Sequence, residues 1–314
     1  MKQTQIERRL TIASEFYYGI FALCPAIFVA SLLAQSGGPI AFVLAGGLGL
    51  SIVTALTLRY IKIGKQLKQH ATSLVALAAA MSWQLDQTDT MWLPPELDDS
   101  SLLLVANRGV HVFNYLTTDS WNYLDVSYEV YQKTKNGEYK AATVYYSVLV
   151  TKLPRILPNV FFDSKTQRGR QYKSKFTGDQ RHSLEGNFDN YFDTYFAEGY
   201  TIDDMSFVTP DVMQALIAAS DYDIEIVQDR LLMYGPVYVD ANMVNDGATK
   251  LIEILRTLKI TAAAYRDSRL PGAAAAQAVT PQGMFLRRKK AAIWPTIIFI
   301  TVYIIVRIVA EIKH

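Results

Sequence analysis

Carboxylates are the densest set of side chains in this sequence that could do chemistry. Asp189 and Asp193 stand four residues apart, and Asp203 and Asp204 are adjacent. Paired carboxylates can bind a divalent cation or act as a general acid and base. The same region carries aromatic residues between the acids: Phe188, Tyr191, Phe192, Tyr195 and Phe196. We therefore expect an acidic, solvated face on an element with an aromatic core, and keep the four acids as weak metal candidates.

A basic stretch precedes these acids. Residues 164–182 hold six Lys/Arg and one acid, whereas residues 183–229 hold eleven acids and neither Lys nor Arg. The basic residues are candidates for binding an anion or a partner: Lys165, Arg168, Arg170, Lys173, Lys175 and Arg181. The first interpretation is that they neutralise the acidic region beside them. An anionic lipid head group or a protein partner is the alternative. We do not expect a nucleic acid, because only Tyr172 and Phe176 offer stacking surfaces.

No recognised catalytic motif accompanies these charges. The histidines, His70, His111, His182 and His314, are far apart and have no metal-ligand spacing. There is no G-x-S-x-G, H-E-x-x-H or P-loop sequence. The single cysteine, Cys24, excludes a disulfide within the chain. The sequence therefore predicts no catalytic residue and no cofactor, and it leaves enzymatic activity uncertain and not favoured.

Net charge and hydropathy indicate how the whole chain is organised. The 314 residues are 50% hydrophobic and 19% charged, with a net charge of +2, so no global field points to nucleic acid. Three apolar runs are each long enough to cross a hydrocarbon core of about 30 Å: residues 16–34, 39–58 and 291–310. The first two predict a helical hairpin. A cleaved signal peptide is the alternative for the first run.

Lys and Arg near these runs predict an orientation. Basic clusters precede the first run, follow the second and precede the third, while the short loop at 35–38 has none. The positive-inside rule then predicts a multi-pass protein of the bacterial inner membrane, with the N-terminus and main domain in the cytoplasm and the C-terminus on the far side. The lipid bilayer is the expected partner.

The expected division of the chain follows from these runs and from composition. We predict a tail with two transmembrane helices (1–59), a juxtamembrane helix (60–86), a connector (87–101), a cytosolic α+β domain (102–267), a flexible tether with a basic flank (268–290), a transmembrane helix (291–310) and a tail (311–314). The fold class is thus an α+β domain, an antiparallel meander plus helices, with an N-terminal transmembrane hairpin and a C-terminal transmembrane helix.

The meander is predicted from strand-like alternation. Runs rich in Val, Tyr and Phe cover 102–116, 121–134, 138–153 and 159–163, and Asn136-Gly137 predicts a hairpin turn. Thr209, Pro210 and Asp211 predict a helix start, followed by short strands at 223–229, 230–235 and 236–241. An amphipathic helix at 242–266 should close the domain.

Two segments resemble a known family. `TKLPRILPNVFFDS` at Thr151, and `LEGNFDNYFDTYFAEGYTIDDMSFVTPDVMQALI` followed by `DIEIVQDRLLMYG`, are similar to the cytosolic core of uncharacterised bacterial membrane proteins that carry a domain of unknown function. The resemblance covers roughly residues 103–239. It implies an N-terminal helix pair and a folded cytosolic unit, and it brings no catalytic residue.

The expected function is that of an integral membrane protein whose cytosolic domain binds or scaffolds a partner. One alternative is a membrane-tethered, metal-dependent enzyme that uses the acidic cluster. Another is a subunit of an oligomeric transporter, which the small number of polar residues within the apolar runs does not favour.

Overall fold

The computed structural model describes residues 54, 57–58, 61, 65–66, 68–88, 94–100, 109–134, 137–166, 176–235 and 241–287. The backbone alone is described at 130, 132–134, 139–145 and 276.

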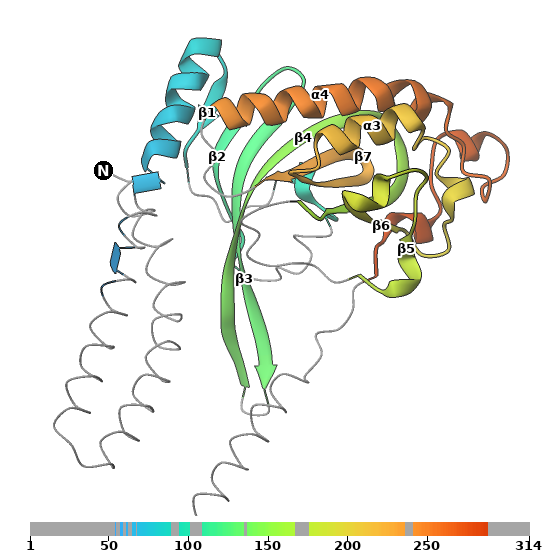
Figure 1. Ribbon diagram of the computed structural model, residues 1–314, viewed down its shortest axis with the longest axis horizontal. Coiled ribbons are helices and arrows are strands. Elements are labelled where there is room, and N and C mark those ends of the chain that lie inside the picture. Colours follow the sequence, from blue (N-terminus) through green and yellow to red (C-terminus); the bar gives the residue numbers. More distant parts are fainter. Residues whose placement is uncertain are drawn as a thin grey trace, which may run out of the picture.

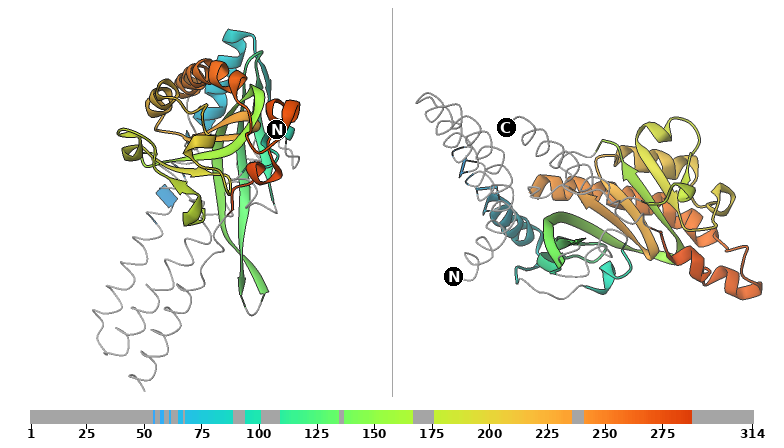
Figure 2. Two further views of the ribbon diagram at one scale, coloured as in Figure 1. Left: turned by 90° about the vertical axis from the view of Figure 1, so that its right-hand side faces the viewer. Right: turned by 90° about the horizontal axis from the view of Figure 1, so that it is seen from below.

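One antiparallel sheet forms the centre of the described structure (Figure 1). Its strands are β1 (Gln84–Asp86), β2 (His111–Thr117), β3 (Asn122–Thr134), β4 (Gly137–Ser164), β6 (Phe192–Phe196) and β5 (Arg181–His182), in that order, and β7 (Asp223–Gly235) pairs with β4. β3 and β4 form the predicted hairpin, since Thr134 pairs with Gly137 across the turn. The hairpin extends away from the rest of the sheet (Figures 1 and 2).

β4 is the strand that joins the two parts of the sheet. Its first half pairs with β3 as far as Val150, and its last residues, Val160–Ser164, pair with β6. The register with β7 shifts between Lys152 and Leu157, where Pro154 lies within the strand. Because proline lacks an amide hydrogen, it loosens the ladder at this point and allows β4 to bend. The sequence predicted two strands here, 138–153 and 159–163, and the structure joins them.

Helices cover one face of the sheet (Figure 1). These are α3 (Pro210–Ala218) and α4 (Ala241–Ala264), close to the predicted ranges. The core beneath them is apolar, and its side chains at less than 2% exposure include Phe162, Phe192, Leu231 and Leu251. A helical segment at 68–81 also packs here through Leu74, Leu77 and Ala78.

The opposite face of the sheet has its own core. Tyr128, Tyr146 and Tyr234 are buried there with Phe161. The 3-10 turn η1 (Pro95–Leu97) contributes Leu97 to this core. These three tyrosines therefore fill a core. The other 3-10 turns are η2 (Gly178–Gln180), η3 (Phe188–Asn190), η4 (Ile202–Asp204), η5 (Gly272–Ala276) and η6 (Pro281–Met284).

The segment 268–287, expected to be part of a tether, is hydrogen-bonded to the sheet and its loops. Asn159 Nδ2 donates to the carbonyl of Met284 at 2.7 Å, and Tyr200 Oη donates to Asp267 just before the segment. Arg287 N donates to Gln180 Oε1 at 2.8 Å. The turns η5 and η6 lie between these contacts, so this part of the chain adds to the domain instead of leaving it.

The membrane part of the predicted fold class is corrected. Within the described ranges, no helix is both long and apolar enough to cross a membrane. α4 has 24 residues but carries five charged side chains, Asp246, Lys250, Glu253, Arg256 and Lys259, and α3 has only 9 residues. The architecture described is an α+β antiparallel sheet, and the transmembrane hairpin and C-terminal transmembrane helix are not part of it.

The predicted multi-pass inner-membrane localisation depended on the same three runs and is corrected with them. Runs 16–34 and 291–310 lie outside the described residues, as does most of 39–58; its described positions, Thr54, Thr57 and Leu58, are helical.

Candidate functional site

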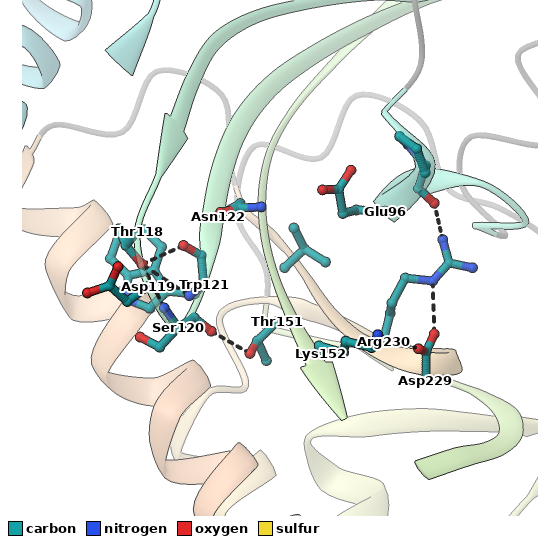
Figure 3. A pocket seen from close by; sticks show the side chains of 12 residues that line it. Glu96, Thr118, Asp119, Ser120, Trp121, Asn122, Thr151, Lys152, Asp229 and Arg230 are labelled. Atoms are coloured by element: carbon teal, nitrogen blue, oxygen red, sulfur yellow. Dashed lines mark hydrogen bonds and ion pairs between the residues drawn. The ribbon is translucent and has the colours of Figure 1, made fainter. Parts of the chain in front are cut away.

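A hollow of about 470 Å³ opens at the start of β3, beside the middle of β4 and β7 (Figure 3). This volume falls in the range of small-ligand sites, roughly 300–1,000 Å³. Its lining residues are Pro95, Glu96, Thr118, Asp119, Ser120, Trp121, Asn122, Val150, Thr151, Lys152, Asp229 and Arg230. The turn 118–121 lies on one side and Glu96 and Arg230 on the other, with Asn122 and Thr151 between them (Figure 3).

The hollow exists because β4 continues beyond the point where β3 begins. Asn122 is the first residue of β3 and pairs with Val150, while β4 continues beyond that point. The turn between β2 and β3 fills part of this space and is tightly held. Thr118 Oγ1 donates to the Trp121 carbonyl at 2.6 Å and accepts from the Trp121 amide at 3.0 Å. Thr151 Oγ1 donates to the Ser120 carbonyl at 2.7 Å, which fixes the turn against β4.

Arg230 ties the far side of the hollow together. Its Nη1 donates to the Pro95 carbonyl, and its Nε lies 3.8 Å from Asp229 Oδ1. Lys152 Nζ lies 3.6 Å from Asp229 Oδ2, and 81% of the Lys152 side chain is exposed. Both cations of the hollow are therefore directed at the same carboxylate, and Arg230 holds η1 against β7.

Glu96 is oriented by a chain of two hydrogen bonds. Asn122 Nδ2 donates to Tyr115 Oη at 3.0 Å, and Tyr115 Oη donates to Glu96 Oε1 at 3.1 Å. Burial, followed by the charge of Glu96, raises the pKa of Tyr115 to about 12, so the phenol keeps its proton and remains a donor. Glu96 Oε2 is buried and accepts no hydrogen bond from any residue that the structure describes.

A second polar cluster lies on the opposite face of the sheet, beneath the helical segment 68–81. Asp125 is its centre and accepts four hydrogen bonds. His70 Nε2 and Asn114 Nδ2 lie 2.6 and 2.8 Å from Oδ2. Tyr123 Oη and Ser147 Oγ donate to Oδ1 at 2.8 and 2.7 Å. Every member of the cluster is less than 10% exposed.

This buried cluster contains residue types that occur in catalytic triads, but they are not arranged as in a triad. In a nucleophilic triad the histidine lies between the hydroxyl and the carboxylate, whereas here Ser147 donates to Asp125 directly. Burial works to raise the pKa of Asp125, but the charge of His70 and the hydrogen bonds lower it below its usual value. The cluster therefore supplies hydrogen bonds to a carboxylate buried inside the fold.

Basic and acidic candidates from the sequence meet on β6, beside its neighbours β4 and β5. Lys165 Nζ and Arg181 Nη2 lie 3.1 and 2.6 Å from the same atom, Asp193 Oδ1. Burial raises the pKa of Asp193, but Lys165 and then Arg181 outweigh it and lower the pKa. The remaining basic candidates, Arg168, Arg170, Lys173 and Lys175, lie outside the described residues. Binding of an anionic lipid or a protein partner through them stays a prediction.

Of the other acidic candidates, Asp189 and Asp204 accept hydrogen bonds from other residues. Asp189 accepts hydrogen bonds from Ser183 Oγ and from the Leu184 amide. Asp204 bonds both Nη atoms of Arg269, at 2.5 and 2.8 Å, while Asp203 is exposed. No group of three or more His, Cys, Asp or Glu that could hold a metal ion is found in the described part of the chain.

Sequence reasoning missed the residues of the hollow. Glu96 was assigned to a connector, and its partner Tyr115 lies 19 residues further along the chain. Pro95 and Arg230 are 135 residues apart. No local spacing links positions this distant, so only the tertiary fold reveals the site.

Comparisons with known proteins add little to this geometry. No protein-family model matches the chain, and no curated protein matches it. Among solved structures it is similar to the crystal structure of the mycobacterial trehalose monomycolate transport factor A, TtfA, with 11% identity and a TM-score of 0.39. That match covers 61% of this chain and 95% of the other. The resemblance to bacterial proteins with a domain of unknown function stays a prediction, and function must be argued from this chain's own residues.

Proposed function

We propose that this chain is a binding domain, and that its ligand or partner docks in the hollow at the start of β3, beside the middle of β4 and β7. The observation that carries this proposal is that a buried carboxylate oxygen of Glu96 accepts no hydrogen bond from a described residue. Its carboxylate is oriented by Tyr115 and Asn122 at the wall of the hollow, and Oε2 has no hydrogen-bond partner among the described residues. A buried acceptor without a donor costs about 1–3 kcal/mol, which a bound donor would recover.

The distribution of reactive groups favours binding over catalysis. The residues best suited to acid–base or nucleophilic chemistry, His70, Asp125 and Ser147, are sealed in the core and bonded to one another. A substrate could not reach them without separation of the helical segment from the sheet. The accessible polar groups lie instead in the hollow, on a wall that strands and a tight turn hold in place.

A ligand screen tests this function without assuming a ligand. Isotope-labelled full-length protein would be screened by NMR against a mixed set of small molecules and short peptides. We expect hits whose shifts map to residues 118–122 and 150–152. Ser120→Trp should remove them, because the exposed Ser120 side chain faces the hollow and indole would fill it.

The matched control is Ser206→Trp, which places the same side chain at an exposed position outside the hollow. It should leave the hits unchanged. Hits that map elsewhere and survive Ser120→Trp would show that the hollow is not the binding site.

A further inference from the structure

Among the described residues, some charged side chains of the hollow have an ion-pair partner and others have none. Three carboxylates line it, Glu96, Asp119 and Asp229, against two cations, Lys152 and Arg230. Both cations are directed at Asp229. Neither Glu96 nor Asp119 has an ion-pair partner among the residues that the structure describes. A negative charge therefore remains on each side of the hollow.

We infer that the hollow binds a primary ammonium group on an alkyl chain, with Glu96 as its main anchor; this inference rests on the proposed function. An ammonium has three N–H donors and a compact charge. Rotation of a glutamate carboxylate about its last torsion is soft, so a donor that enters the hollow can reach Oε2. The carboxylate of Glu96 points from η1 toward Asn122, across the space that the ligand would fill (Figure 3).

The surrounding residues suit the rest of such a ligand. Val150 and Trp121 give the alkyl chain an apolar wall, and both are buried in the protein core. Asp119 lies at the exposed turn on the far side and can accept a second ammonium. The ligand chemistry is therefore that of a diamine or of a lysine side chain, which share the ammonium and the alkyl chain.

An anionic ligand fits the same residues less well. Arg230 uses Nη1 on the Pro95 carbonyl and lies against Asp229, so it is not free to turn toward the hollow without releasing η1. Lys152 is largely exposed and already near Asp229. An added carboxylate or phosphate would face the unpaired charges of Glu96 and Asp119, and like charges in a partly desolvated site repel.

The test is a titration of the full-length protein, followed by NMR, with four probes of similar length. These are 1,5-diaminopentane, Nα-acetyl-lysine amide, 1,5-pentanediol and glutarate. We expect saturable shifts at 118–122 and 150–152 with the two amines, weaker binding at high salt, and no comparable binding of the diol or glutarate. Glu96→Gln should weaken amine binding by about tenfold or more, because it removes a charge-assisted hydrogen bond.

Two further variants show whether a loss of amine binding in Glu96→Gln is specific to the hollow. Glu185→Gln removes an exposed acid outside the hollow and should leave amine binding unchanged. Asp119→Asn alters only an exposed turn, so it tests the site even if Glu96→Gln disturbs η1. A severalfold loss for the diamine alone with Asp119→Asn indicates a free diamine as the ligand. Tighter binding of the lysine amide indicates a lysine of a partner.

The inference is overturned if the diol or glutarate binds as tightly as the amines, or if Glu96→Gln binds them as tightly as the wild type does. Failure of the amines, with other compounds from the screen still bound in the hollow, removes this inference and leaves the proposed function standing. Failure of every compound in the hollow removes both.

Discussion

His70 Nε2 lies 2.6 Å from Asp125 Oδ2, and the two residues are 55 positions apart in the chain. His70 belongs to the helical segment 68–81, and Asp125 lies near the start of β3. Both residues are less than 5% exposed. A carboxylate at this depth is stabilised only when its oxygens are hydrogen-bonded, and Asn114, Tyr123 and Ser147 provide further bonds.

Removal of one member of the pair should strongly destabilise the fold. His70→Ala leaves the Asp125 carboxylate buried without the imidazole that contacts it, so we expect the free energy of unfolding to fall by about 3–5 kcal/mol. Urea denaturation of the full-length protein measures this loss. His182→Ala is the control, because His182 stacks on Phe196 and forms no ion pair among the described residues, and it should cost about 1 kcal/mol. Equal losses in the two variants would contradict a special role for the buried pair.

Local patterns allowed much of the fold to be predicted. Asn136-Gly137 predicted the β3–β4 hairpin, and Thr209-Pro210-Asp211 predicted the start of α3, because turn and cap preferences depend only on neighbouring residues. The 3.6-residue period also predicted α4, where Leu251, Leu258 and Ala262 are buried.

Long-range features could not be predicted in this way. β7 was divided at Gln228-Asp229, yet it runs through that point as one strand with a positive φ of 56° at Gln228. The Asn159 side chain supports this conformation by accepting from the Gln228 amide at 3.0 Å, and the two residues are 69 positions apart. His70 was treated as isolated for the same reason, because its partners Asp125 and Tyr123 lie on β3, more than 50 residues further along the chain. The hollow depends on such contacts entirely.

The same asparagine gives a test of how the C-terminal segment is attached. Asn159→Ala removes the acceptor for Gln228 N and the donor for the Met284 carbonyl. Two backbone groups then lose partners, so we expect a loss of about 1–3 kcal/mol in urea and faster hydrogen exchange at the Gln228 amide. Asn187→Ala, at an exposed position, should change neither. An unchanged hydrogen-exchange rate at the Gln228 amide would show that β7 keeps the positive φ at Gln228 without this contact.

Acid should weaken the contact between η4 and the segment after α4. The hydrogen bond from Arg269, helped by the Thr201 amide and hydroxyl, lowers the pKa of Asp204 to about 2 from its usual 3.8. A carboxylate with a depressed folded-state pKa stabilises the fold above its unfolded pKa, and this stabilisation disappears as the pH falls through the folded value. Between about pH 4 and pH 2 the urea midpoint of Asp204→Asn should therefore fall less steeply than that of the wild type.

Asp203→Asn is the matched control for this pH effect, since the neighbouring Asp203 is exposed and makes no ion pair with a described residue. It should follow the wild-type curve. If both variants gave the same slope, the pH dependence would come from another carboxylate, such as Asp125.

Close packing between α4 and the sheet gives a fourth prediction. A Cβ at Gly247 would lie 2.6 Å from Leu149 Cδ1 and 2.8 Å from Tyr222 Oη. Gly247→Ala gains up to about 1 kcal/mol in helix propensity but overpacks the interface, which costs about 1–3 kcal/mol. We expect a net loss of stability in urea, whereas Asn245→Ala, exposed on the same helix, should be neutral or stabilising. A stabilised Gly247→Ala would mean that α4 can move away from β4 at little cost.

The acidic candidates can be tested against the metal hypothesis through Asp193. Lys165 and Arg181 share Asp193 Oδ1, and the Arg181 side chain is 55% exposed, so these are surface pairs worth about 1 kcal/mol or less in total. Asp193→Asn should lower stability by that amount at low salt, and the difference should shrink at high salt as the charges are screened. Because the two cations already occupy the carboxylate, Mg²⁺ should raise the melting temperature of wild type and variant equally. A larger Mg²⁺ effect on the wild type would instead identify Asp193 as a metal ligand that competes with Lys165 and Arg181.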